Sequence, residues 1–248
     1  MKTPPATAGR PLRSRRNLLV VLAVLVLAGV AAGGFGVWYI LIGLPSPSAA
    51  APVIPADASV PVPASLDGSW QVSENFGSMS DFTASWVGYR VQEQLAGVGG
   101  HTAVGRTPKV TGSLTLAGST VSAVSITADL TVLASDSAQR DDQLRRQAIQ
   151  TDSFPTATFT LTQPISLGSL PADGTTVSAT ASGNLTIHGV TKSVQISIQA
   201  QGKGGIVGVA GSLPIVFGDY GFQGPSSFAV VSVNDHGTME LHLLFTHA

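Results

Sequence analysis

Apolar and polar residues alternate strictly over much of the second half of this chain, and this alternation limits what it can fold into. In residues 124–132, Val124, Ile126 and Leu130 alternate with serine, threonine and aspartate. The same pattern occupies residues 110–116, 156–162, 176–187, 193–199 and 239–245. A period of two gives an extended strand one apolar and one polar face. The pattern therefore predicts an antiparallel sheet with one face buried and the other mostly in water.

The length of these runs favours a closed barrel over two packed sheets. Several of them reach about ten residues, whereas strands of globular proteins average about five or six. Glycine-containing turn sequences separate them, as at Ala117-Gly118, Asp173-Gly174 and His188-Gly189. Closure removes exposed strand edges, and a barrel of about eight strands has room for one apolar ligand. We therefore expect residues 66–248 to be all-β, forming an eight-stranded antiparallel lipocalin-like barrel.

One segment breaks the alternation and predicts a short helix. It runs from Ser137 to Gln150, and Ser137 can cap its N-terminus. Leu144 and Ala148 stand four positions apart on one helix face, and Pro155 disfavours helical backbone just after the segment. Its charged residues are expected to form pairs four apart on a solvated face, such as Asp141–Arg145 and Asp142–Arg146, or to meet a ligand headgroup: Arg140, Asp141, Asp142, Arg145 and Arg146.

An uncharged apolar run, Leu18–Leu44, precedes the alternating region and predicts a transmembrane helix. It is about 27 residues long, and about 20 suffice to cross the bilayer core. Trp38 and Tyr39 lie near its far end, where amphipathic aromatic residues prefer the membrane interface. The arginines within residues 1–17 predict a cytoplasmic N-terminus and an extracytoplasmic C-terminal domain on a single-pass membrane protein. Cleavage after the small residues 48–51, or a twin-arginine signal, is the alternative interpretation.

Residues 45–65 are rich in proline, alanine and serine. Prolines stand at positions 45, 47, 52, 55, 61 and 63. Such a density predicts an extended, semi-stiff linker with little chance of forming a core. The expected organisation is therefore a basic N-terminus (1–17), a membrane helix (18–44), a linker (45–65) and a β-barrel (66–248).

Composition argues against several classes of function. From residue 45 onward there are 8 Lys and Arg against 14 Asp and Glu, so this part lacks the basic surface of a nucleic-acid-binding domain. The chain has no cysteine, which excludes disulfides, thiol catalysis and thiolate metal sites. The histidines show no zinc-site spacing, and neither a G-x-S-x-G elbow nor a phosphate-binding loop is present. We expect no cofactor, no metal and no enzymatic activity.

Several short motifs, taken in order, resemble the YceI-like family of bacterial lipid-binding barrels. The motifs are Gly68-Ser69-Trp70, Arg140–Leu144, Phe154-Pro155 with Phe159, Gly183–Val194 and Phe217–Gly221. The resemblance covers roughly residues 66–248 and implies a long barrel that holds a polyisoprenoid, such as a quinone or polyprenol, in an apolar tunnel. The membrane helix and linker depart from the usual family member, in which a cleaved signal stands at this place.

The resemblance implies that inward apolar residues line the tunnel, whereas the residues alone favour a filled core. The predicted lining residues are Val124, Ile126, Leu130, Leu144, Phe154, Phe159, Leu185, Ile187, Phe217, Tyr220, Phe222 and Leu243. Small inward residues, such as Gly112, Ala128, Ala179, Ala181, Gly183 and Gly211, are expected to leave space beside the large ones.

The leading hypothesis is a membrane-tethered, extracytoplasmic protein that binds an isoprenoid lipid and has no catalytic step. One alternative is a structural or interaction module of the cell envelope with a filled barrel and an unknown protein partner. Another is an enzyme acting on the bound lipid, which would need a titratable group in the tunnel.

Overall fold

The computed structural model describes residues 51–97, 99–168, 173–225 and 230–248. The predicted N-terminal region and membrane helix, residues 1–44, lie outside this part, as does the start of the predicted linker. None of the helices within these ranges has the length and apolar character needed to cross a membrane.

Strands dominate the described chain, as the alternation predicts. They are β1 (Gly68–Val72), β2 (Trp86–Leu95), β3 (Gly99–Thr107), β4 (Val110–Ala117), β5 (Thr120–Asp129), β6 (Ala134–Ser135), β7 (Thr156–Leu161), β8 (Ile165–Ser166), β9 (Thr176–Ile187), β10 (Val190–Lys203), β11 (Ile206–Val216), β12 (Val230–Val233) and β13 (His236–His247). The helical elements are α2 (Ala138–Gln143), the π-helical turn η1 (Leu144–Ala148) and the 3-10 turn η2 (Phe217–Tyr220).

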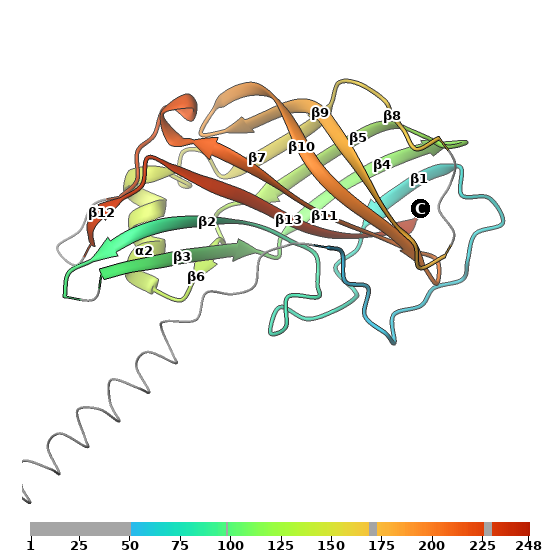
Figure 1. Cartoon of the computed structure of the whole chain (residues 1–248), viewed down its shortest axis with the longest axis horizontal. Coiled ribbons are helices and arrows are strands. Elements are labelled where there is room, and N and C mark those ends of the chain that lie inside the picture. The colour runs from blue at the N-terminus through green and yellow to red at the C-terminus, as the bar shows by residue number, and fades with distance from the viewer. Residues whose placement is uncertain (1–50, 98, 169–172, 226–229) are drawn as a thin grey trace, which may run out of the picture. The chain divides into compact units, whose positions relative to one another are not determined.

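Eight of these strands close into an antiparallel barrel (Figure 1). Their order is β1-β4-β5-β7-β9-β10-β11-β13, and pairing of β13 with β1 completes the ring. Tight turns join β9 to β10 and β10 to β11, and these two strand pairs are in register over most of their length. The predicted all-β barrel with a short helix is thereby confirmed.

The last strand, β13, holds the barrel and a smaller side sheet together. One edge of β13 pairs with β11 along almost its whole length. The other edge is divided, because Phe245–His247 pair with β1 while Thr238–His242 pair with β2. The side sheet continues from β2 to β3 and β6, and α2 lies beside it at one end of the barrel (Figure 1).

The predicted helix is present but is shorter and differently paired than expected. The Ser137 hydroxyl accepts a hydrogen bond from the Arg140 N–H at the start of α2, as predicted. The charged pairs differ, since Arg140 pairs with Asp136 and Arg145 with Asp142. The Asp141 carboxylate instead accepts hydrogen bonds from Ser135, because β6 lies within its reach. The helix therefore serves to fix β6 to the end of the barrel.

A strap, residues 51–66, packs along the outside of the barrel. Ile54 is buried in a cluster with Ile206 and Leu244. The Val60 N–H donates to the Gly204 carbonyl at 3.1 Å. The expectation that this linker forms no core contacts is therefore wrong for Ile54 and Val60, because apolar residues between the prolines cover apolar outward positions of β11 and β13.

Two polar residues of β13 that the alternation assigns to the wet outer face are buried, His242 against the strap and the loop 73–85 and Glu240 against Arg90 and Arg106 of the side sheet. Glu240 and His242 do point outward from β13, but each is only 2% exposed. The Val53 N–H donates to Nε2 of His242 at 2.9 Å, so Nδ1 carries the proton and donates to the Ala84 carbonyl at 2.8 Å. Burial lowers the pKa of the His242 ring, which is therefore neutral in the folded protein at neutral pH.

Candidate ligand-binding cavity

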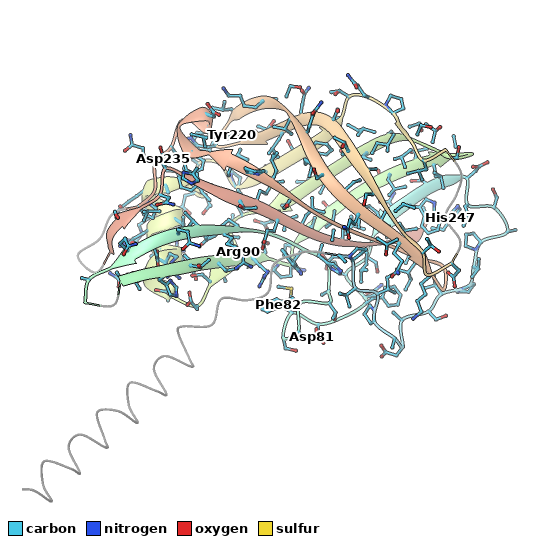
Figure 2. All side chains as sticks on the ribbon, in the orientation of Figure 1. Asp81, Phe82, Arg90, Tyr220, Asp235 and His247 are labelled. Carbon is cyan, nitrogen blue, oxygen red and sulfur yellow. The ribbon has the colours of Figure 1, made fainter. Side chains whose placement is uncertain are left out.

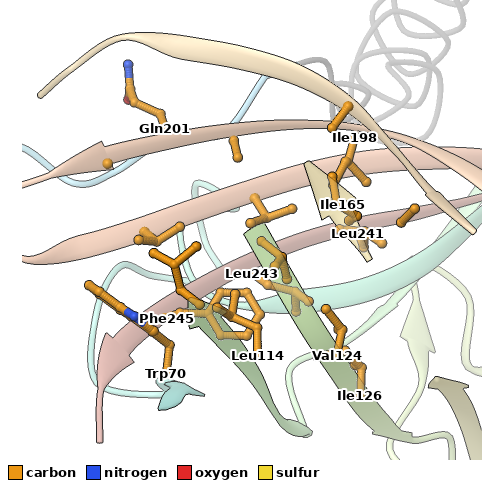
Figure 3. A pocket seen from close by; sticks show the side chains of 18 of the residues that line it. Trp70, Leu114, Val124, Ile126, Ile165, Ile198, Gln201, Leu241, Leu243 and Phe245 are labelled. Atoms are coloured by element: carbon orange, nitrogen blue, oxygen red, sulfur yellow. The ribbon is translucent and has the colours of Figure 1, made fainter. Parts of the chain in front are cut away.

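A cavity of about 530 Å³ lies inside the barrel. This volume falls in the usual range of sites for small ligands, about 300–1,000 Å³. Its wall is formed by inward side chains of the barrel strands, with Leu114, Val124, Ile126, Leu241 and Leu243 converging on the same space (Figure 3). Away from one end the lining is aliphatic and aromatic apart from Thr158, so this main cavity suits an apolar chain and offers it few polar contacts.

Small alanines are the direct reason for the empty space. Ala128, Ala179 and Ala181 line the cavity, where larger side chains would fill it. The inward glycines have another role: a Cβ on Gly183 would lie 2.4 Å from the Phe159 ring, and one on Gly112 would lie 2.8 Å from Cδ1 of Ile126. The expectation that small residues leave space holds for these alanines. It is wrong for Gly183 and Gly112, which accommodate a large neighbour.

The polar end of the main cavity is its mouth, formed by Asp173, Gln201 and the turn Gly202–Gly205. Gln201 stands apart from the apolar side chains (Figure 3), and its side-chain amide donates to the Gly174 carbonyl at 2.7 Å. Lys203 lies in the same turn and is exposed. A ligand with an oxygen-bearing headgroup would find its hydrogen-bond donors here.

The strap contributes to this mouth as well as to the outer wall. Val62 and Leu66 line the main cavity, and the Trp70 indole N–H donates to the Leu66 carbonyl at 3.0 Å. Trp70 itself is 1% exposed and packs edge-on against His247, with ring centroids 5.2 Å apart. These contacts fix the position at which the strap joins β1.

A second, smaller cavity of about 90 Å³ lies toward the opposite end of the barrel. Its wall includes Leu144 and Ile149 near the helix and the stacked rings of Phe217 and Phe222, whose centroids are 5.3 Å apart. Tyr220 of η2 and His247 of β13 mark these opposite ends (Figure 2). The predicted single tunnel is thus divided into two cavities.

The predicted lining residues separate between the two cavities. Five line the main cavity: Val124, Ile126, Phe159, Leu185 and Leu243. Five line the second cavity: Leu130, Leu144, Ile187, Phe217 and Phe222. Whether any of them contacts a ligand stays a prediction.

Phe154 and Tyr220 lie outside both cavity walls. Phe154 packs on the ring of His188 with centroids 4.2 Å apart, and this ring donates from Nδ1 to the Tyr220 carbonyl at 3.1 Å. Tyr220 is 3% exposed; burial raises the pKa of its hydroxyl, and the carboxylate of Asp219 raises it further. Both residues hold the β9–β10 turn against η2 and have no direct place in the cavities.

Several lining residues were missed although their signal is present in the sequence. Leu114, Leu116, Ile196, Ile198, Leu241 and Phe245 occupy apolar positions of alternating runs, next to residues that were predicted. Trp70 belongs to a motif recognised in the sequence. Nothing periodic marks the mouth residues, which lie at or next to turns.

The charged residues proposed as a headgroup site lie away from both cavity walls. Arg140 donates to the buried Glu93 carboxylate at 2.6 Å, and His101 lies 3.1 Å from the same carboxylate. Arg140 of α2 thus pairs with the buried carboxylate of Glu93, which lies on β2 of the side sheet. Within the described residues, no three histidine or carboxylate side chains gather where they could hold a metal ion.

Both the sequence and the fold of this chain are similar to known proteins. A family model described as the YceI-like domain matches residues 79–245. A polyisoprenoid-binding domain from Saccharophagus degradans, implicated in plant cell wall breakdown, has the same fold, with a TM-score of 0.54 and 17% identity over 72% of this chain and 98% of that one.

Two further crystal structures are less similar. BcnA of Burkholderia cenocepacia gives a TM-score of 0.49 and 21% identity, covering 64% of this chain and 95% of that one. A YCEI protein of Campylobacter jejuni gives a TM-score of 0.46 and 15% identity, covering 56% of this chain and 82% of that one. No curated protein matches the sequence at a significant level.

Proposed function

Because the chain belongs to the YceI-like family, we propose that it is a lipid-binding protein that holds an isoprenoid tail, such as that of a quinone or polyprenol, inside the barrel. The observation that carries this proposal is the main cavity of about 530 Å³, whose lining away from the mouth is apolar apart from Thr158. The S. degradans domain of the same fold, which binds polyisoprenoid, supports the same class of ligand.

Affinity in such a site comes from removing the tail from water. Each buried methylene contributes about 0.8 kcal/mol, so a branched hydrocarbon chain needs no polar contact to bind. The polar groups at the mouth then orient the ligand, because a carbonyl or hydroxyl headgroup loses its hydrogen bonds if it enters the apolar interior. Lys203 supplies donors at that end, since the Gln201 side-chain amide already donates to the Gly174 carbonyl and the Thr176 hydroxyl.

We also place the barrel outside the cytoplasm, tethered to the membrane by residues 18–44. The uncharged run and the arginines that precede it support this topology. A tethered barrel would take up or release its ligand beside the bilayer that contains it. We propose that it acts by binding alone, and the aliphatic and aromatic lining of the inner part of the main cavity favours this.

The proposal is tested by native mass spectrometry of the full chain, purified in mild detergent from its own membranes. The informative variant is Ala181→Phe, because Ala181 is buried and lines the main cavity. The matched control is Ala123→Phe, because Ala123 is exposed on the same barrel. The wild type and the control should carry one prenyl lipid per chain, and Ala181→Phe should lose most of it.

A bare protein mass that does not change after quinones and polyprenols are offered would contradict the proposal. The barrel would then bind no isoprenoid, and a role as an interaction module of the cell envelope would be favoured.

A further inference from the structure

The two cavities meet at one constriction inside the barrel. Only Val87 of β2, Ala157 of β7 and Met239 of β13 line both cavities among the described residues. Strands β2 and β13 are paired neighbours, whereas β7 lies in another part of the barrel wall, so Val87 and Met239 approach this point from one side and Ala157 from another. The main cavity lies on the mouth side of this point, and the second cavity lies on the side of η1 and η2.

The second cavity has the character of a site for hydrocarbon. Its wall is mostly aliphatic and aromatic, with Leu130, Ile187 and Phe217 among its members. A buried water needs two to four polar partners, and the polar side chains on this wall are limited to Tyr89, Arg90 and Thr238. An empty apolar cavity leaves its lining atoms without dispersion contacts, so an apolar group is the occupant that suits it.

The constriction is formed by residues that differ in stiffness. Met239 is 9% exposed and carries an unbranched side chain with three rotatable bonds, so it can turn aside at low cost. Val87 is β-branched and stiff. Ala157 extends only one carbon beyond the backbone, so it narrows the connection between the two cavities less than a larger side chain would.

We propose that the second cavity receives the far end of the isoprenoid tail, and that Met239 and Ala157 set the tail length that the barrel accepts. This inference rests on the proposed function. A short tail fits within the main cavity and never reaches the constriction. A long tail displaces Met239 and gains further burial in the second cavity, where Phe217 and Phe222 form part of the wall.

The test uses competition between two quinones that differ only in tail length, of about two and about eight isoprene units. The full-length protein in mild detergent is incubated with equal amounts of both, and native mass spectrometry gives the ratio of the two complexes. Ala157→Leu narrows the constriction and should shift this ratio toward the short tail by about tenfold or more, since each excluded methylene weakens binding severalfold. Met239→Ala widens the constriction and should shift the ratio toward the long tail.

The matched control is Ala200→Leu, which changes the wall of the main cavity near the mouth. Both tails pass this position, so both complexes should weaken together and the ratio should stay unchanged. If Ala157→Leu and Met239→Ala also leave the ratio unchanged, the inference is wrong while the proposed function stands. If the wild type binds neither quinone nor polyprenols of the same two lengths, the proposed function fails and the inference with it.

Discussion

The carboxylate of Glu240 allows a quantitative test of how the side sheet is held to the barrel. Nε and Nη2 of Arg90 donate to its two oxygens at 3.1 and 3.4 Å, and the Arg106 guanidinium lies 4.0 Å away. The Glu240 side chain is 3% exposed, and that of Arg106 is 5% exposed. Burial lowers the pKa of Arg106 and the charge of Glu240 raises it, so this carboxylate helps to keep the guanidinium charged.

Glu240→Gln keeps the shape of the side chain but removes its buried negative charge from beside the Arg90 and Arg106 guanidinium groups. Breaking a buried ion pair in this way costs about 3–5 kcal/mol. The lower end applies here, because the Arg90 side chain is 18% exposed and the glutamine oxygen still accepts one hydrogen bond. We therefore expect the free energy of unfolding in urea, followed by tryptophan fluorescence, to fall by about 3 kcal/mol.

Glu74→Gln is the matched control. Its carboxylate lies 3.2 Å from Nζ of Lys109, a similar separation to that in the Glu240 pair, but the two side chains are 46% and 58% exposed. An exposed pair contributes about 0–1 kcal/mol, so this variant should unfold almost like the wild type. Equal losses in the two variants, or a loss below about 1 kcal/mol for Glu240→Gln, would refute the argument that burial determines the strength of these pairs.

Two further predictions concern the strap and the barrel wall. As the pH falls below about 6.5, the unfolded chain binds a proton at His242 before the folded protein does, so the free energy of unfolding should fall. His242→Gln should flatten this dependence of the unfolding free energy on pH. An unchanged slope would contradict the prediction. Gly183→Ala should lower the free energy of unfolding by about 1–3 kcal/mol, because its Cβ would lie 2.4 Å from the Phe159 ring. The control Gly202→Ala meets no atom within 4 Å and should leave the melting temperature nearly unchanged. Similar losses of stability in both variants would contradict the steric argument.

The barrel could be predicted from the sequence because the alternation of apolar and polar residues shows, position by position, which side chains of a strand are buried. The strands β4, β5, β9, β10 and β13 each have one face turned to the interior, and their apolar positions are therefore visible without any tertiary information. The side sheet gives no such signal. In β2, Trp86 and Gly88 are buried on one face and Val91 and Glu93 on the other, so the buried face changes along the strand.

The details of the site depend on contacts between distant segments, which no local pattern contains. His242 is buried because the strap and the loop 73–85 contact it, and Glu240 is buried beside Arg90 and Arg106 of the side sheet. The division of the tunnel at Met239 depends on side chains from three strands that meet at one point. Both features become visible only when the register of the whole barrel is known.

The position of β13 has a consequence for the order of events during synthesis. The strand that closes the ring is the last of the barrel strands to be synthesised, and its final residues pair with the first strand, as His247 does with Trp70 and Phe245 with Val72. The barrel cannot close before β13 has been made, since β1, β2 and β11 all pair with this strand. Pairings so far apart in sequence form slowly and leave strand edges open meanwhile. The newly made barrel is therefore most vulnerable to aggregation in the interval before β13 is available to pair.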